Sequence, residues 1–206
     1  MEAPRSTVFV VDDDRSFRTA LTRLLRSVGH SVQAFDSAER FLAEHDADAA
    51  GCLVLDLTMP GLDGLSLQDL LAERGSQRPI VFLTGRGDIL TSVRAMKHGA
   101  VDFLTKPVDE TALLKAVREA LEDDLRSRRD GFEQAEFRRR WVTLTPRERE
   151  VAGHVIAGRL NKQIAFELGT VERTVKLHRS HLMAKLNLHS VAELARLAER
   201  TGIEPL

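Results

Sequence analysis

Polar side chains stand directly after several short apolar runs in the first half of this 206-residue chain. The polar residues that follow these runs are, in chain order, Asp12 and Asp13, Asp56, Thr84 and Lys106. Short apolar runs of this kind are typical of strands that are buried on both faces of a parallel sheet. Because the carboxyl ends of parallel strands share one edge of a sheet, we expect these side chains to converge on one cleft.

Carboxylates, a hydroxyl and an ammonium group in one cleft are suited to binding a metal ion and a phosphoryl group. Mg2+ prefers oxygen ligands, and two or three carboxylates can share the ion with a phosphate. Asp56 could act as a nucleophile, as in aspartyl-phosphate enzymes. Lys106 could neutralise one phosphoryl oxygen, and Thr84 could donate a hydrogen bond to another. Taken singly, each side chain also fits a turn at a strand end, and Asp14 fits an N-cap better than a metal ligand.

Strand and helix patterns alternate five times through residues 1–118. The apolar spacing predicts strands over residues 7–11, 32–35, 52–55, 79–83 and 101–104. It predicts helices over residues 15–28, 38–44, 65–73 and 89–98, and a long helix that begins near Asp109. The alternation predicts an α/β fold with a five-stranded, doubly wound parallel sheet.

Four motifs in this half fall in the order and spacing of a known family: VVDDD, LDLTMPGLDG, VFLTG and DFLTKP. On these motifs, residues 7–118 resemble the flavodoxin-like receiver domain of the two-component response regulators. The resemblance implies that Asp56 is the phosphoacceptor and that a sensor histidine kinase supplies the phosphoryl group. It also implies that Mg2+ is bound by Asp12, Asp13 and Asp56 and by the backbone carbonyl of Thr58.

The resemblance further implies a switch built on three side chains. Thr84 would be the switch hydroxyl, Lys106 the phosphate-binding lysine and Phe103 the switch aromatic. Many relatives have tyrosine at the last position, whereas this chain contains no tyrosine at all. The peptide bond between Lys106 and Pro107 is expected to be cis, an isomer that proline makes accessible.

An apolar stripe that advances by threes and fours runs from Leu114 to Val142. This spacing predicts that the helix from Asp109 continues to at least Arg128, so that residues 119–141 form a helical linker. Gly131 is the expected break or hinge, because glycine costs about 1 kcal/mol relative to alanine inside a helix.

Residues 142–206 have the pattern of a small all-α domain. Thr145, Pro146 and Glu148 have the spacing of a capping box that opens a helix. Further helices are expected over residues 161–168, 171–186 and 190–200, and the first two of these are joined by a Gly-containing turn, as in a helix-turn-helix. The segment carries ten basic and seven acidic side chains, a small excess that favours nucleic acid as its partner.

The motifs LTPREREV, NKQIAFELG and TVKLHRSHLMAKL of this segment resemble the LuxR-type DNA-binding domain. With the receiver domain they make the chain similar to FixJ/NarL-type regulators, which implies binding to double-stranded promoter DNA. The resemblance implies that base edges are contacted by Lys176, Leu177 and Ser180. It implies that phosphates are contacted by Arg173, Thr174, His178, Arg179 and Lys185.

These observations predict a transcription regulator that is controlled by phosphorylation and that catalyses only its own phosphorylation and dephosphorylation. We expect a homodimer on phosphorylation or DNA binding, with residues 89–98 and 101–105 as the remodelled surface. The N-terminus lacks a signal-peptide core, and no apolar run reaches membrane-spanning length, so a cytoplasmic protein without membrane contact is expected. The single cysteine, Cys52, lies in an apolar run and is expected to be a buried structural thiol.

Two other functions fit parts of the sequence. A Mg2+-dependent phosphatase of the haloacid-dehalogenase type would use Asp12 as nucleophile and Asp14 as general acid, but it would leave Asp56 and the helix-turn-helix without a role. A DNA-binding scaffold that no longer uses phosphate would leave the set of acids, Thr84 and Lys106 without a role.

Overall fold

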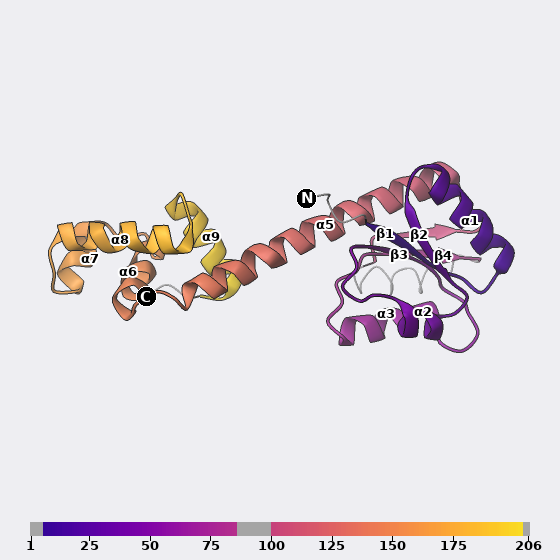
Figure 1. Cartoon of the computed structure of the whole chain (residues 1–206), viewed down its shortest axis with the longest axis horizontal. Coiled ribbons are helices and arrows are strands. Elements are labelled where there is room, and N and C mark those ends of the chain that lie inside the picture. Colours follow the sequence, from indigo (N-terminus) through magenta and orange to yellow (C-terminus); the bar gives the residue numbers. More distant parts are fainter. Residues whose placement is uncertain (1–5, 86–99, 204–206) are drawn as a thin grey trace. The chain divides into compact units, whose positions relative to one another are not determined.

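The computed structural model describes residues 6–85 and 100–203. The chain divides into two compact units, Met1–Arg128 and Arg129–Leu206 (Figure 1). The boundary falls inside the segment expected to be a separate linker, so residues 119–141 are shared between the two units.

The first unit alternates strands and helices, as the apolar spacing predicts. Its elements are β1 (Thr7–Val11), α1 (Arg15–Ser27), β2 (Ser31–Phe35), α2 (Ala38–Glu44), β3 (Gly51–Asp56), α3 (Gly64–Glu73), β4 (Ile80–Thr84), β5 (Asp102–Thr105) and the first part of α5 (Glu110–Trp141). All neighbouring strands are parallel, in the order β2-β1-β3-β4-β5. The predicted five-stranded, doubly wound sheet is therefore confirmed, whereas the helix expected over residues 89–98 lies outside the described residues.

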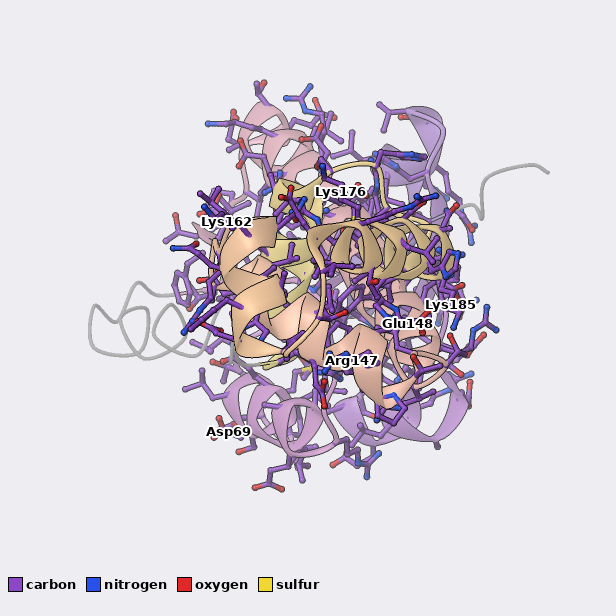
Figure 2. The ribbon with its side chains drawn as sticks, turned by 90° about the vertical axis from the view of Figure 1, so that its left-hand side faces the viewer. Asp69, Arg147, Glu148, Lys162, Lys176 and Lys185 are labelled. Atoms are coloured by element: carbon purple, nitrogen blue, oxygen red, sulfur yellow. The ribbon has the colours of Figure 1, made fainter. Side chains whose placement is uncertain are left out.

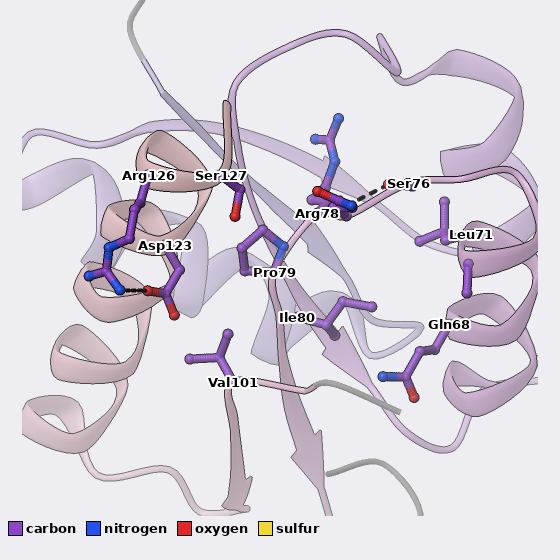
Figure 3. A pocket seen from close by; sticks show the side chains of 12 residues that line it. Gln68, Leu71, Ser76, Arg78, Pro79, Ile80, Val101, Asp123, Arg126 and Ser127 are labelled. Atoms are coloured by element: carbon purple, nitrogen blue, oxygen red, sulfur yellow. Dashed lines mark hydrogen bonds and ion pairs between the residues drawn. The ribbon is translucent and has the colours of Figure 1, made fainter. Parts of the chain in front are cut away.

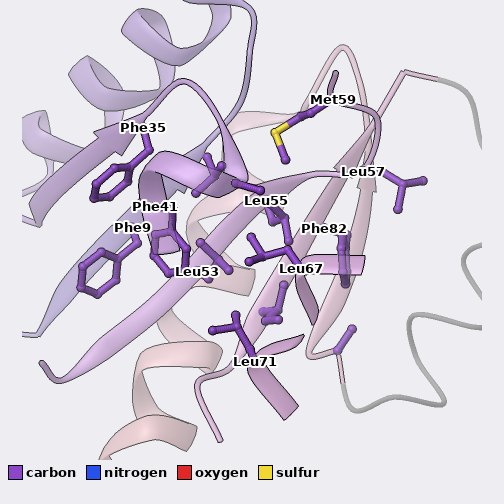
Figure 4. Close-up of a cluster of buried hydrophobic side chains, with 14 residues drawn as sticks. Phe9, Phe35, Phe41, Leu53, Leu55, Leu57, Met59, Leu67, Leu71 and Phe82 are labelled. Carbon is purple, nitrogen blue, oxygen red and sulfur yellow. The ribbon is translucent and has the colours of Figure 1, made fainter. Parts of the chain in front are cut away.

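Alternate residues of the strands supply two hydrophobic cores, one on each face of the sheet. On one face, side chains such as Phe9 of β1 pack against α2 and α3 (Figures 1 and 4). On the other face, side chains such as Val10 pack against α1 and α5. Cys52 is fully buried in this second core, as expected for a structural thiol, and burial raises the pKa of its thiol to about 12.

A cluster of hydrogen bonds attaches α5 to the loop before β3. Asp124 is buried, and one of its carboxylate oxygens accepts a hydrogen bond of 2.8 Å from the backbone N–H of Gly51. Arg128 donates to Asp124 through Nε at 2.9 Å and to the carbonyls of Asp48 and Ala49 at 2.8 Å each. Arg128, a charged interruption of the apolar stripe in sequence, is thus an anchor of α5 on the first unit.

Helix α5 is continuous beyond Arg128, as predicted, and it continues through Gly131, so the break expected there is wrong, whereas a hinge at Gly131 stays a prediction. A Cβ built on Gly131 would meet no atom within 4 Å other than those of its own stretch of helix, and the backbone around it stays helical. On the following turns, Glu133 accepts hydrogen bonds of 2.9 and 3.1 Å from Arg196, and Phe137 is 2% exposed in the core of the second unit. These tertiary contacts outweigh the intrinsic cost of about 1 kcal/mol for one glycine.

The second unit is helical around its own core. Beyond the last part of α5 it contains α6 (Pro146–Ile156), α7 (Asn161–Glu167), α8 (Glu172–Leu186) and α9 (Val191–Thr201). The predicted capping box of Thr145 and Glu148 is present at the start of α6. Within the described ranges, none of the helices is both long and apolar enough to span a membrane.

Candidate functional site

The carboxyl ends of β1 and β3 bring three carboxylates together. Each of Asp12, Asp13 and Asp56 offers an oxygen within 4.8 Å of the others. We call these three residues the acidic cluster. Asp12 is fully buried and Asp56 is 5% exposed, whereas Asp13 is exposed, so the cluster is open to solvent on one side. The convergence expected from parallel strands is therefore observed.

Lys106 lies between the two buried members of the acidic cluster. Its Nζ is 2.6 Å from Oδ2 of Asp12 and 3.0 Å from Oδ2 of Asp56. Partial burial opposes its charge, but the hydrogen bonds to Asp12 and Asp56 outweigh that effect and raise the pKa of Lys106. Burial, which the hydrogen bond from Lys106 only partly offsets, raises the pKa of Asp12. The single positive charge of Lys106 therefore cannot neutralise both the Asp12 and the Asp56 carboxylate.

The position of Lys106 is set by the end of β4. Its backbone N–H donates a 2.6 Å hydrogen bond to the carbonyl of Thr84, and its peptide bond to Pro107 is cis, as expected. Thr84 itself is 2% exposed. Phe103, the expected switch aromatic, is partly buried on β5 with its ring centroid 6.2 Å from that of Phe82. Thr84 follows Leu83, the register partner of Asp56, and so ends β4 beside the acidic cluster, while Phe103 lies on the neighbouring strand β5 opposite Phe82.

The oxygen-rich donor set of the acidic cluster fits a hard divalent cation such as Mg2+. The exposed Asp13 leaves an open side for ordered water and for a phosphoryl oxygen. The backbone N–H of Thr58 lies 3.4 Å from Oδ1 of Asp56, which places the backbone of Thr58 next to the cluster while its side chain is exposed.

The first turn of α1 also contacts the site, which the sequence did not indicate. Asp14 is the N-cap of α1, as predicted: its Oδ1 accepts from the backbone N–H groups of Ser16 and Phe17. Arg18 donates a 2.5 Å hydrogen bond to the carbonyl of Asp12. Because the Asp14 carboxylate already accepts these two backbone hydrogen bonds, the structure does not support a role for Asp14 as the general acid of a phosphatase.

A separate hollow of about 370 Å3 lies at the opposite edge of the sheet (Figure 3). Pro79, just before the start of β4, lines it together with Asp123 and Arg126 of α5, which form an ion pair of 3.4 Å. Asp56 ends β3 at the carboxyl edge, so this hollow is not part of the acidic cluster.

Helix α8 of the second unit presents an exposed basic and polar face. The expected base-contacting residues Lys176, Leu177 and Ser180 are all exposed, and Leu177 retains 54% of its accessible surface. Among the expected phosphate contacts, Arg173 and Lys185 are exposed, and Thr174, His178 and Arg179 are half-buried. The helix after the Gly-containing turn thus offers a surface suited to a DNA groove.

Lys185, at the far end of α8 from Lys176, is engaged with a buried carboxylate (Figure 2). Its Nζ donates a 2.7 Å hydrogen bond to Oε2 of Glu148. The same oxygen accepts from the backbone N–H of Thr145 at 2.8 Å and from its hydroxyl at 3.0 Å. In this structure Lys185 therefore links α8 to the start of α6, and its contact with a DNA phosphate stays a prediction.

Comparison with known proteins identifies both halves of the chain. Residues 8–118 match the response regulator receiver domain, and residues 142–198 match the luxR family of bacterial regulatory proteins. Nodulation protein W of Bradyrhizobium diazoefficiens is 48% identical over 199 residues, which cover 97% of this chain and 88% of that protein.

Two further similarities extend over nearly the whole chain. The transcriptional regulatory protein FixJ of Bradyrhizobium diazoefficiens is 39% identical over 196 residues, or 95% of this chain and 96% of FixJ. The solved structure of the response regulator StyR is 47% identical and has a TM-score of 0.79, with 95% of this chain and 99% of that chain covered. The chain therefore belongs to the FixJ-type response regulators, transcription regulators that join a receiver domain to a LuxR-type DNA-binding domain.

Proposed function

We propose that Asp56 accepts a phosphoryl group in the presence of Mg2+ and that this modification controls binding of the second unit to promoter DNA. The observation that carries the proposal is Lys106, whose ammonium group lies between Asp12 and Asp56 at 2.6 and 3.0 Å. This arrangement keeps a counter-charge beside the carboxylate that would gain the phosphoryl group. A sensor histidine kinase is the proposed donor, in line with the receiver family.

In the proposed transfer, an oxygen of Asp56 attacks the phosphorus atom, and the bond from phosphorus to the donor atom breaks with its electron pair leaving on the donor. Asp12, Asp13, Asp56 and the carbonyl of Thr58 would hold Mg2+, which supplies positive charge to the transferring oxygens. Lys106 would remain as the second counter-charge. Attack of water on the phosphorus atom would later release phosphate and restore the Asp56 carboxylate.

The added phosphoryl group brings about −1.5 to −2 units of charge to the end of β3. The buried hydroxyl of Thr84 would turn to donate a hydrogen bond to it, and Phe103 would move inward into the space that Thr84 leaves. Because Phe103 lies on an edge strand, its movement would remodel the outer surface of β5. We propose that this surface then supports a homodimer.

The DNA contacts proposed for the second unit divide into two classes. Lys176, Leu177 and Ser180 would read base edges, where lysine can contact guanine and leucine a thymine methyl group. The phosphate contacts would be Arg173, Thr174, His178, Arg179 and Lys185. The exposed side chains among them lie on α8, the second helix of the helix-turn-helix.

A binding titration tests the proposal on a genomic fragment that the chain selects. The wild-type chain is titrated at fixed salt with and without acetyl phosphate and Mg2+, next to Asp56→Asn. Allosteric coupling of ordinary strength predicts that acetyl phosphate tightens wild-type binding about 5- to 150-fold. Asp56→Asn should show no change. Equal tightening in both proteins, or in neither, would contradict the proposal.

A further inference from the structure

Phe17, on the first turn of α1, contacts the ammonium group of Lys106. The Nζ atom of Lys106 lies 4.3 Å from the centroid of the Phe17 ring. That distance is within the range in which a cation is attracted to the negative face of an aromatic ring. The Lys106 side chain is only 19% exposed, so water screens the attraction less than it would at the surface.

The position of Phe17 is tied to the acidic cluster through the backbone. Oδ1 of Asp12 accepts a 2.9 Å hydrogen bond from the N–H of Asp14. Oδ1 of Asp14 in turn accepts a 3.1 Å hydrogen bond from the N–H of Phe17, as the N-cap of α1. The ring, the ammonium group and the Asp12 carboxylate therefore form a closed loop of contacts, and the helix start fixes where the ring lies.

The contacts of Lys106 place it in competition with a bound cation. Its hydrogen bond of 2.6 Å to Oδ2 of Asp12 occupies an oxygen that a divalent ion would need. A cation at Asp12 would repel the ammonium group, and the long flexible stem of lysine lets that group move away. Without a further contact, the Lys106 side chain could turn toward solvent and leave Asp56 before the phosphoryl group is transferred.

We propose that Phe17 is a positioning residue that keeps the Lys106 ammonium group beside Asp56 when a divalent cation takes over Asp12. This inference rests on the proposed function and specifies how the site is prepared for an incoming phosphoryl group. The face of the ring attracts the ammonium group but offers no lone pair to a metal ion. It therefore holds Lys106 without adding a competing metal ligand.

Three full-length variants separate the ring from ordinary packing. Phe17→Leu keeps an apolar side chain but removes the aromatic face, and Phe17→Tyr restores the face. Leu24→Ala is the matched control, because Leu24 is also half-buried on α1 and packs against the same core as Phe17. Labelling by acetyl phosphate is followed by intact mass at several donor and Mg2+ concentrations, and Mg2+ affinity is measured by calorimetry.

Phe17→Leu should lower the maximal labelling rate about three- to tenfold, as expected for loss of one partly desolvated cation–π contact. Its half-saturating donor concentration should stay near the wild-type value, and its Mg2+ affinity should be equal or tighter. Phe17→Tyr and Leu24→Ala should label at close to the wild-type rate. An unchanged rate in Phe17→Leu, an equally slow Phe17→Tyr, or a weaker Mg2+ affinity in Phe17→Leu would overturn the inference.

A second readout does not depend on phosphoryl transfer. In nitrogen-edited NMR spectra, the Lys106 ammonium protons should exchange with water several times faster in Phe17→Leu than in the wild type. Equal exchange would overturn the inference by itself. A wild-type chain that takes no label at all would refute the proposed function, whereas the ammonium signal would still decide whether Phe17 holds Lys106.

Discussion

Each unit of the molecule buries a carboxylate against a lysine, and the two networks differ in how well the carboxylates are satisfied. In the second unit, Oε2 of Glu148 accepts from Lys185 and twice from Thr145. In the first unit, the ammonium group of Lys106 is shared between two carboxylates of the acidic cluster, those of Asp12 and Asp56. A saturated carboxylate stabilises a fold, whereas a group of carboxylates with too few donors retains the capacity to bind a cation or react.

The pKa values of the two networks change in opposite directions. Burial opposes ionisation of Glu148, but the hydrogen bonds from Lys185 and Thr145 outweigh it and lower its pKa to about 2. Burial has the larger effect at Asp12 and raises its pKa despite the contact with Lys106. Glu148 is therefore ionised throughout the neutral range, whereas burial makes the charged form of Asp12 less favourable than in water.

Removing one acid from the acidic cluster should have the largest effect of the variants considered below. Asp12→Asn should weaken Mg2+ binding at least about tenfold, because a charged oxygen ligand becomes a neutral amide. Its free energy of unfolding should stay equal or rise, because burial disfavours the charge of Asp12 more than the contact with Lys106 favours it, and Lys106 keeps its hydrogen bond to Asp56. Calorimetry with Mg2+ and urea denaturation measure the two effects. Asp48→Asn, which changes an exposed acid near the opposite edge of the sheet, is the control and should change neither.

The opposite result is expected for Glu148. Glu148→Gln keeps a side chain of the same shape but loses the charged hydrogen bond to Lys185, so stability should fall by about 1.5–3 kcal/mol. Urea denaturation followed through Trp141, the single tryptophan, reports on the second unit. Glu150→Gln is the control, since Glu150 pairs with Arg147 near the surface and should contribute less than about 1 kcal/mol. If Glu148→Gln were as stable as the wild type, the Glu148 network would not stabilise the fold, and the proposed difference between the two networks would be wrong.

The contact between Glu148 and Lys185 also predicts that the stability of the second unit depends on pH. Because the pKa of Glu148 is about 2 in the folded chain and near 4.3 in an unfolded one, its contribution is fully present above about pH 4.5. As pH falls from there toward 2, the folded carboxylate loses its advantage. The stability difference between wild type and Glu148→Gln should therefore shrink over this range. A difference that stays constant down to pH 2 would contradict the assignment of the low pKa to Glu148.

The two lysines on α8 should separate DNA recognition from stability. Lys176→Ala should weaken binding to the selected operator by about 1–3 kcal/mol and relax its sequence preference. Its fold should be unaffected, because the 3.2 Å pair with Glu172 is exposed. Lys185→Ala should lower stability as Glu148→Gln does. Titrations of both variants against operator and scrambled duplexes measure these changes in DNA affinity. An equal loss of affinity for both duplexes in Lys176→Ala would show that Lys176 contacts a phosphate and not a base.

The smallest effect is expected at Gly131 of α5, which belongs to neither network. Gly131→Ala should raise stability by up to about 1 kcal/mol, since the added Cβ meets no atom within 4 Å beyond its own stretch of helix. It should leave Mg2+ binding and the Glu148 network unchanged. Thermal denaturation measures the gain, and a destabilised variant would show that the helix is not continuous there in solution.

The first network could be predicted from sequence and the second only in part. Asp12, Asp56 and Lys106 are far apart in the chain, but the rule that parallel strands end at one edge brings them together without further information. Thr145 and Glu148 were recognised because a capping box is local. The hydrogen bond from Lys185 was not, because it depends on how α8 packs against α6, which no local pattern encodes.

Two other residues show the same limit. The apolar spacing predicted a helix over residues 15–28, which includes Phe17, but it did not indicate that the Phe17 ring would face Lys106. At Gly131 the intrinsic propensity predicted a break, and the contacts that keep the helix intact come from Arg196 and the core around Phe137. Local sequence therefore specified the elements and the edge where the acids meet, while contacts between elements decided the rest.

The central claim is that the unsaturated acidic cluster, and not the saturated Glu148 network, is the reactive one. Peptide mapping by mass spectrometry of the full-length chain after brief exposure to acetyl phosphate and Mg2+ tests it most directly. We predict one phosphoryl group per chain, located on Asp56 and absent when Mg2+ is withheld. Labelling of Glu148 or any carboxylate other than Asp56, or labelling of Asp56 without Mg2+, would contradict the claim.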